Sequence, residues 1–215
     1  MARPKNQTAR RAQLVAAATR AVSKHGPARV RVADIADAAG VARGSVHYYF
    51  QDLDELLRQV YKEAVDRFFT RRMARVSALS DARDKLVASA HCGLPHGPDD
   101  ELVRTLYRFS SDLPDDPVQQ AHIEGLTDRQ VVLYMGILEV GVAQGHFRLS
   151  EPALDIATNL VGLEDAYGLH IIASSSVITN RRALDLILGY ARTATGCADL
   201  TPDRPTAVTP EDPAQ

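Results

Sequence analysis

Apolar residues recur at intervals of three and four along most of this chain, which is the spacing that places side chains on one face of an α-helix. One such run begins near Gln13 and ends at His25-Gly26-Pro27, because glycine and proline terminate helices. A second, short run over Val32–Ala39 stops at Gly40, and a third short run follows that glycine. We therefore predict one helix followed by two short helices around the turn Ala39-Gly40-Val41.

A long helix is predicted from Asp52 onward. Asp52 and Glu55 have the spacing of a capping pair, in which side-chain oxygens accept hydrogen bonds from free backbone N–H groups at the helix start. The apolar residues that follow keep one face for about seven turns; they are Leu53, Leu57, Val60, Ala64 and Phe68. Further helices are predicted near 81–92, 100–112, 117–144, 151–174 and 177–196. With no convincing strand pattern, the predicted fold class is all-α with about nine helices.

The two ends of the chain have little to bury. Residues 1–12 are polar and carry Arg3, Lys5, Arg10 and Arg11, and Pro4 disfavours an early helix, so we predict a flexible basic arm there. Residues 198–215 contain four prolines and few apolar side chains, so we predict a disordered tail.

Charge is distributed unevenly. Residues 1–50 contain nine Lys and Arg against two Asp, a net charge of +7, whereas residues 51–215 contain 16 basic and 25 acidic residues, a net charge of −9. A positive segment on an otherwise acidic chain indicates a polyanionic partner for that segment. The alternative is a solvated charge run without a nucleic-acid partner.

Composition narrows the class of protein. The chain is 45% hydrophobic and 24% charged, which is typical of soluble globular proteins. The start of the chain does not resemble a signal peptide, and the longest uncharged run, Ala166–Asn180, is shorter than the ~20 residues that span a bilayer. We therefore expect a cytoplasmic protein without a membrane partner. Cys92 and Cys197 have no metal-ligand spacing, so no metal and no cofactor are expected.

Two short helices around a glycine turn, packed under a third helix, have the plan of a helix-turn-helix, whose second helix enters the DNA major groove. On that helix Val46 and Phe50 share an inner face at i and i+4. The outward residues suit DNA because arginine can contact guanine or phosphate, hydroxyl groups can donate to phosphate, and glycine allows close backbone approach. These residues are Arg43, Gly44, Ser45, His47 and Tyr48.

Residues 14–57 resemble the TetR/AcrR family of repressors, above all in Val32-Ala33-Asp34-Ile35-Ala36, Ala39-Gly40-Val41 and Gly44-Ser45-Val46-His47-Tyr48-Tyr49-Phe50. The resemblance implies an N-terminal three-helix DNA-binding head, residues 13–51, and a C-terminal helical ligand-binding and dimerisation domain, residues 52–197. It also implies DNA contacts by Tyr49 and, near phosphate, by Arg31. The implied function is a homodimeric repressor that binds a palindromic operator and is released by a small-molecule effector. The alternative to DNA contact by Tyr48 and Tyr49 is that both side chains pack in the core.

The last two predicted helices are rich in small and apolar residues, and pairing them across a two-fold axis would bury both. The predicted dimer-interface residues are Leu160, Ile171, Leu184, Ile187 and Leu188. The alternative is that the same residues form the core of one protomer.

Glu164 falls within the apolar arc of the eighth predicted helix, and a buried carboxylate needs a partner. That partner is an arginine, a hydroxyl cluster, a second subunit or a cationic ligand. If Glu164 faces a pocket, aromatic side chains could attract an amine or quaternary ammonium effector; the candidates are Tyr61, Phe68, Tyr107, Phe109, Tyr134 and Tyr167. Residues 161–172 also resemble choline-responsive, BetI-like members. The expected effector is cationic or hydrophobic.

Two other classes of function compete with a ligand-controlled repressor. The histidines and Cys92 form no recognisable catalytic set, and GxSxG, HExxH and phosphate-binding glycine loops are missing, so we do not expect an enzyme. A transcriptional activator or a ligand-independent DNA-binding protein of the same fold remains the nearer alternative.

Overall fold

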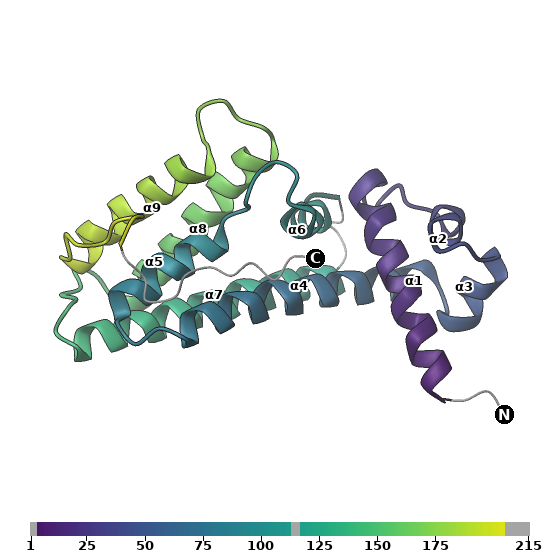
Figure 1. Cartoon of the computed structure of the whole chain (residues 1–215), viewed down its shortest axis with the longest axis horizontal. Coiled ribbons are helices and arrows are strands. Elements are labelled where there is room, and N and C mark those ends of the chain that lie inside the picture. The colour runs from purple at the N-terminus through teal and green to yellow at the C-terminus, as the bar shows by residue number, and fades with distance from the viewer. Residues whose placement is uncertain (1–3, 113–116, 205–215) are drawn as a thin grey trace. The chain divides into compact units, whose positions relative to one another are not determined.

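The computed structural model describes residues 4–112 and 117–204, without the side chains of residues 4–6, 112, 118 and 119. This part of the chain forms nine α-helices and no β-strand, which confirms the predicted all-α class (Figure 1). The helices are α1 (Pro4–His25), α2 (Val32–Ala39), α3 (Arg43–Tyr49), α4 (Leu53–Ser77), α5 (Ala82–Gly93), α6 (Glu101–Asp112), α7 (Pro117–Ala143), α8 (Ala153–Ile172) and α9 (Asn180–Thr195).

The chain divides into two compact units. The first runs up to Phe68 and resumes over Glu101–Glu124, and the second contains Phe69–Asp100 and the chain from Gly125 onward. Helices α4 and α7 each contribute to both units. The sequence-based boundary between residues 51 and 52 therefore lies inside the first unit, because α6 packs against α1 and joins the helix-turn-helix segment.

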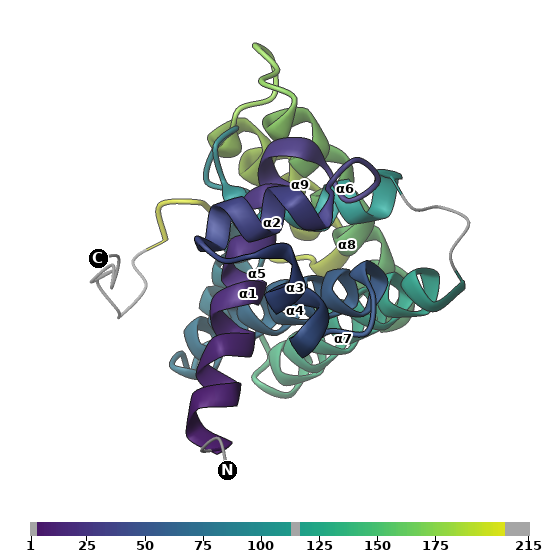
Figure 2. The ribbon, with the colours of Figure 1, turned by 90° about the vertical axis from the view of Figure 1, so that its right-hand side faces the viewer.

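In the first unit, α1 packs against both α2 and α3 (Figure 2). The three helices share an apolar core because each presents one stripe of apolar side chains inward. The fully or nearly fully buried members are Leu14, Val15, Ala18, Val22, Ile35, Ala36, Val46 and Phe50. The structure thus confirms the two short helices that the apolar spacing predicts.

Gly40 makes the turn between α2 and α3. Its φ of 66° lies in the left-handed region, where a side chain would be strained. The backbone N–H of Gly40 donates to the Asp37 carbonyl at 3.2 Å, and that of Val41 donates to the Ala36 carbonyl at 3.0 Å. These bonds satisfy the last carbonyls of α2 and end the helix. The observed turn, Gly40–Ala42, lies one residue later than the predicted one.

The start of α4 matches the predicted capping pair. Asp52 accepts a hydrogen bond from the backbone N–H of Glu55 at 2.6 Å, and Glu55 in turn accepts one from the N–H of Gln51 at 2.8 Å. From Leu53, α4 continues for 25 residues, as its apolar periodicity predicts.

The beginning of α1 corrects the prediction of a flexible arm. The helix starts at Pro4, not at Gln13. Proline is favoured at the first helical position, where its missing N–H would have no partner in any case and its φ already suits the helix. Residues 4–12 are therefore helical, while Arg3 lies outside the described residues and the side chain of Lys5 is not described.

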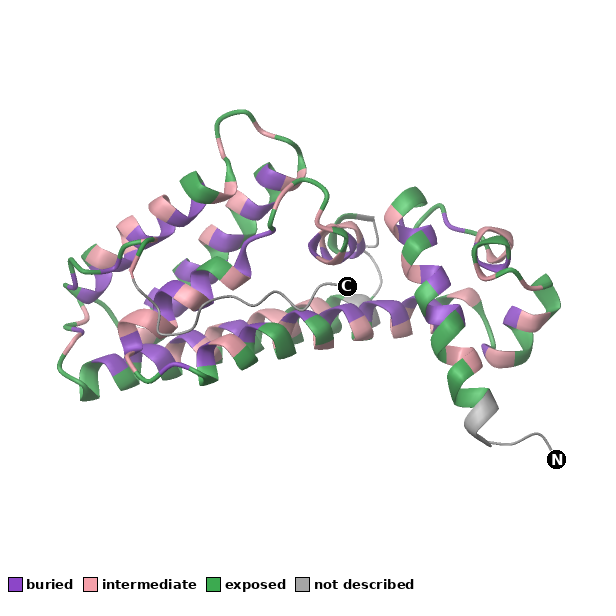
Figure 3. Ribbon diagram, in the orientation of Figure 1, coloured by how far each residue is buried: buried purple, intermediate pink, exposed green. Residues whose placement is uncertain are grey.

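The second unit has its own core, to which α5, α7, α8 and α9 contribute. Helices α8 and α9 pack against each other, and α5 packs against both. In Figure 3 these helices carry buried residues on some faces and exposed residues on others, in agreement with their helical apolar spacing. Among the described helices, none combines the length and the apolar character that a membrane-spanning segment needs.

Residues 198–204 correct the prediction of a disordered tail. Leu200 is fully buried in the core of the second unit, and its carbonyl accepts a hydrogen bond from Arg192 at 2.7 Å. Arg181 pairs with Asp203 at 2.6 Å. The prediction failed because it rested on the proline content of the segment and did not consider that Leu200 could be buried. Residues 205–215, the rest of the predicted tail, lie outside the described residues.

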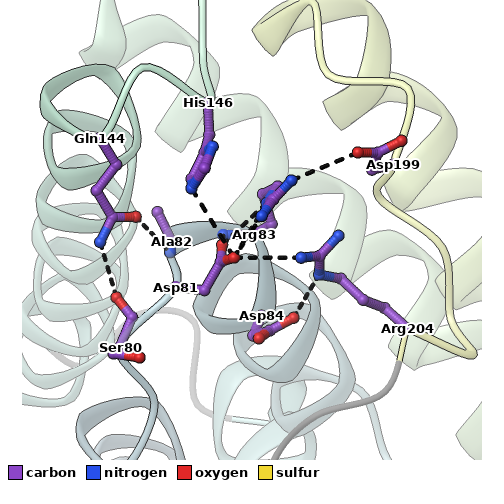
Figure 4. A network of polar contacts seen from close by, with 9 residues as sticks. All are labelled: Ser80, Asp81, Ala82, Arg83, Asp84, Gln144, His146, Asp199 and Arg204. Atoms are coloured by element: carbon purple, nitrogen blue, oxygen red, sulfur yellow. Dashed lines mark hydrogen bonds and ion pairs between the residues drawn. The ribbon is translucent and has the colours of Figure 1, made fainter.

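A polar network centred on Asp81 joins this segment to α5 (Figure 4). Asp81 caps α5 by accepting the backbone N–H of Arg83 at 2.8 Å, and it also pairs with the side chain of Arg83 at 2.6 Å. Arg204 reaches Asp81 at 3.2 Å and contacts Asp84, while Arg83 reaches Asp199 at 3.4 Å. Hydrogen bonds from the Arg83 side chain hold the pKa of Asp81 well below its usual range.

Replacing Leu200 tests whether this segment is part of the fold. We expect Leu200→Ala to lower the free energy of unfolding by about 2–5 kcal/mol, because it leaves a cavity in the core. The matched control is Leu154→Ala on α8, where the leucine is 52% exposed, and its expected cost is below about 0.5 kcal/mol. Urea denaturation measures both, and equal small effects would show that residues 198–204 contribute no stability.

Candidate nucleic-acid interface

Helix α3 presents one buried and one exposed face. Val46 and the following Phe50 are each only 2% exposed, and they anchor the helix in the first unit. On the other side Arg43, Gly44 and His47 are exposed, as is Tyr48, whose exposed fraction is 70%. Ser45 and Tyr49 are half-buried, and Arg31 is exposed just before α2. The predicted DNA-contacting side chains of α3 therefore lie on its accessible part.

The two tyrosines differ in their surroundings. Their rings meet edge to face, with centroids 5.0 Å apart. Tyr48 lies in solvent, so the alternative in which it packs in the core is wrong for this residue. Tyr49 is partly enclosed, and its backbone carbonyl accepts a hydrogen bond from Arg11.

Arg11 of α1 contacts the end of α3 and stabilises its position. Its guanidinium donates to the Tyr49 carbonyl, pairs with Glu55 of α4 at 2.9 Å and lies 4.2 Å above the ring of Phe50. The hydrogen bond from Arg11 lowers the pKa of Glu55. The sequence placed Arg11 in a mobile basic arm, and no local pattern indicates a partner 44 residues away.

Helix α1 also holds the end of α2. The side chain of Gln13 donates to the Ala39 carbonyl at 3.3 Å, and Arg20 donates to the Ala38 carbonyl at 3.0 Å. These carbonyls have no partner inside α2 because they lie in its last turn. Helix α1 thereby positions both helices of the helix-turn-helix through side-chain bonds to their backbones.

A buried charge cluster lies in the second unit. Arg72 of α4 donates to both carboxylate oxygens of Glu164, at 2.8 and 2.9 Å, and both side chains are almost completely buried. Arg72 also donates to Ser89 at 3.0 Å and to Gln130 at 2.8 Å. The hydroxyl of Tyr134 donates to Glu164. Because every partner is hydrogen-bonded, the cluster can persist away from water.

Gly93 makes room for Glu164. A Cβ atom placed on Gly93 would lie 2.2 Å from the Glu164 carboxyl carbon, so only glycine fits at this point of α5. Burial raises the pKa of Glu164 to about 7, although Arg72 and the Tyr134 hydroxyl oppose the rise.

The residues predicted to bind a ligand fall into two groups. Tyr61, Phe68, Tyr107 and Phe109 belong to the first unit, where the rings of Tyr61 and Phe109 are 5.2 Å apart. Tyr134, Glu164 and Tyr167 belong to the second unit.

The structure corrects the ligand-facing interpretation of Glu164. Its oxygens accept hydrogen bonds from Arg72 and Tyr134. An arginine is therefore the partner, which is one of the alternatives left open by the sequence. A cavity of about 70 Å³ in the first unit involves none of the predicted ligand residues; it is lined by Thr19, Val60, Glu63, Ala64, Arg67, Glu101, Leu102 and Thr105.

The predicted dimer-interface residues are core residues of one protomer. All five are buried within the second unit, so they are not available to a partner subunit; they are Leu160, Ile171, Leu184, Ile187 and Leu188. The apolar spacing identified the face of each helix that packs inside the protomer. The alternative in which these residues form the core of one protomer is therefore the correct one. The accessible residues of α8 include Gly162, Ala166 and Leu169, and on α9 Leu186 and Gly189 are partly accessible.

Comparisons with known proteins match this architecture. The family described as bacterial regulatory proteins, tetR family, matches residues 14–60. The chain is 25% identical over 153 residues to the HTH-type transcriptional repressor KstR2 of Mycolicibacterium smegmatis, which covers 71% of this chain and 73% of that protein. It is 34% identical over 82 residues to the HTH-type transcriptional regulator BetI of Agrobacterium fabrum, covering 38% and 40%.

Solved structures share the fold. A Saccharomonospora viridis protein, described as a transcriptional regulator and solved with choline, has a TM-score of 0.80 at 22% identity, covering 87% of this chain and 98% of that one. FadR of Bacillus subtilis, solved with stearoyl-CoA, has a TM-score of 0.67 at 18% identity, covering 81% and 96%. At these identities the likeness extends to the fold.

The buried pair of Arg72 and Glu164 predicts that the stability of an Arg72 variant depends on pH. We expect Arg72→Met to lower the free energy of unfolding by about 3–5 kcal/mol near pH 8, because Glu164 then keeps a buried charge without a partner. Burial already raises the pKa of Glu164 above its ordinary value, so the folded protein holds this proton more tightly than the unfolded chain. The stabilisation from this proton is present at low pH and is lost as the pH rises through about 7.

The loss in Arg72→Met should consequently be smaller near pH 5.5, where Glu164 can become neutral. The control Arg72→Met/Glu164→Leu removes both charges and should be close to the unmodified protein at either pH. Urea denaturation at the two pH values measures the difference. An equal loss at both would show that the protonation state of Glu164 in the variant does not change between the two pH values.

Proposed function

We propose that the chain is a transcriptional regulator of the TetR family, and that it acts as a homodimeric repressor that binds a palindromic DNA operator and is released by a small-molecule effector. The observation that carries the proposal is the accessible face of α3, because side chains of α1 bond to the end of α2 and to the end of α3 and so hold the helix-turn-helix in place. Such a rigidly positioned helix can enter a major groove in a defined register.

In this proposal some residues contact base edges of the DNA and others contact its phosphates. Arg43 and His47 contact base edges, because they project from the accessible face and can donate hydrogen bonds to guanine. Polar groups nearby contact phosphate and orient the protein without reading sequence; they are Ser45, Tyr48, Tyr49 and Arg31, with Arg3 and Lys5 from the start of the chain. Gly44 adds no side chain that would keep the DNA backbone away.

We place the dimer interface on the accessible faces of α8 and α9. Small residues there allow two helices to approach closely, and Leu169 and Leu186 supply apolar surface. A two-fold pairing would present two copies of α3 to successive major grooves, about 34–36 Å apart.

The effector is a small molecule that favours the DNA-free state. Choline and stearoyl-CoA occupy two structures of the same fold, so that fold accommodates both cationic and long apolar ligands. In this chain Glu164 is bonded to Arg72, which removes the carboxylate that would favour a cation. An effector releases DNA only to the extent that it binds the released state more tightly than the DNA-bound state.

The experiment that tests this function selects duplexes from a random DNA library with the full-length protein and footprints the enriched sequence. We expect two symmetric half-sites, and we expect choline or stearoyl-CoA to weaken the footprint if either resembles the natural effector. Absence of any sequence preference over random competitor DNA at moderate salt would refute the proposed operator binding.

Two arginine variants distinguish a residue that contacts a base from a residue that positions α3, and both are measured on the selected operator. Arg43→Ala should lose discrimination at one base position by about 1–3 kcal/mol, because its guanidinium no longer contacts that base. Arg11→Met should weaken binding to all duplexes without changing the salt dependence, because the Arg11 guanidinium is bonded to Tyr49 and Glu55 within the protein. Each lost phosphate contact would instead reduce the slope of log affinity against log salt by about 0.9. A reduced slope in Arg11→Met would assign Arg11 to DNA.

Two glycine variants test the interface. Gly162 on α8 and Gly136 on α7 are both exposed helical glycines with open space where a Cβ would lie, so a glutamate at either is compatible with the folded protomer. We expect Gly162→Glu to dissociate the dimer, because it places two charges across a close helix contact. Gly136→Glu should leave the dimer intact. Sedimentation velocity measures both, and dissociation by Gly136→Glu alone would move the interface to α7.

A further inference from the structure

Four basic side chains gather in the second unit, whereas the proposed DNA-binding face belongs to the first unit. Arg71 and Arg75 lie one turn apart on α4, so they project from the same face of that helix. His91 lies in the last turn of α5, and His96 lies in the loop that follows it. We call these four residues the basic cluster.

Direct contacts join three members of the basic cluster, and Arg75 lies one helical turn from Arg71 on α4. The guanidinium of Arg71 contacts Nε2 of His96, and the ring centroids of His91 and His96 are 6.4 Å apart. Arg71, His91 and His96 are exposed, and Arg75 is half-buried.

The basic cluster has no acidic partner within the described parts of the second unit. None of its four side chains forms an ion pair there with a carboxylate. Asp100 accepts a hydrogen bond from the backbone N–H of His96 at 3.1 Å. Other arginines of this unit, such as Arg83 and Arg181, are paired with aspartates.

This concentration of positive charge affects the neighbouring titratable groups. Desolvation by neighbouring protein atoms lowers the pKa of His91, and the charges of His96, Arg75 and Arg71 lower it further. At the adjacent Cys92, burial raises the pKa of the thiol while Arg72, Arg75 and Arg71 oppose the rise. Both effects indicate a local positive potential that a bound anion would relieve.

We propose that Arg71, Arg75, His91 and His96 bind a phosphoryl group. Two guanidinium groups can donate paired hydrogen bonds to its oxygens, and the two imidazoles add donors when protonated. A group with about two negative charges matches several convergent cations better than a single carboxylate does. The site goes beyond the proposed function, because it requires neither DNA nor the effector.

The test follows the histidine C2–H resonances of the full-length protein by NMR while inorganic phosphate replaces chloride at constant ionic strength. Phosphate should raise the pKa of His91, because an anion stabilises the imidazolium. Arg71→Gln/Arg75→Gln should raise that pKa without any phosphate, since it removes two repelling charges, and should weaken phosphate binding at least about tenfold.

Two controls separate the site from general charge and folding effects. Arg148→Gln/Arg182→Gln removes the same amount of charge from exposed positions of the same unit and should leave phosphate binding unchanged. Arg71→Lys/Arg75→Lys keeps the charge and should retain part of the binding. Circular dichroism melts establish that each variant is folded.

A second titration with ADP identifies the source of the phosphoryl group. Tighter binding of ADP than of phosphate supports a site for a phosphate ester, and binding of phosphate alone supports a site for the free anion. The proposal is overturned if neither ligand shifts the His91 resonance, or if the exposed-arginine control weakens binding as much as Arg71→Gln/Arg75→Gln does. Because no DNA is present, failure here leaves the proposed operator binding untouched.

Discussion

The bidentate pair between Arg72 and Glu164 is the interaction around which the second unit is organised. Removing two charges from water is costly, and only complete hydrogen bonding offsets that cost. Ser89, Gln130 and Tyr134 supply the remaining bonds, so α4, α5, α7 and α8 must all be in place at once. The same requirement explains Gly93, whose missing side chain leaves space for the carboxylate. A pair that tolerates so few arrangements favours one packing of these helices over its alternatives.

In the first unit the corresponding constraint comes from α1. Gln13 and Arg20 bond to the last carbonyls of α2, and Arg11 bonds to the last residue of α3. Helix α3 has only seven residues, too few to be stable by itself in water. Its position therefore depends on the helix that crosses it. Arg11, which the sequence assigns to a basic arm, thus helps to position α3.

Much of the fold could be predicted because helix formation depends on near neighbours. The spacing of Val46 and Phe50 correctly assigned the inner face of α3, and Asp52 and Glu55 marked the start of α4. Where prediction failed, the local signal was ambiguous. Pro4 can oppose a helix or begin one, and an apolar stripe such as that of Leu160 and Leu188 fits a partner subunit as well as the protomer's own core. Only the packing of α8 on α9 distinguishes these possibilities.

The sequence by itself determined the all-helical class, the glycine turn between α2 and α3, and the residues that α3 exposes, because each follows from contacts within a few positions. Tertiary structure decided which charges meet. Arg72 and Glu164 are 92 residues apart, and Arg11 and Glu55 are 44 apart, so nothing in their neighbourhoods selects them from the 25 basic and 27 acidic residues of the chain. It also decided that Leu200 is buried and that Arg71, Arg75, His91 and His96 form no ion pair with a carboxylate in the described part of the second unit. Long-range partners of this kind are chosen by packing, and packing exists only once the helices have assembled.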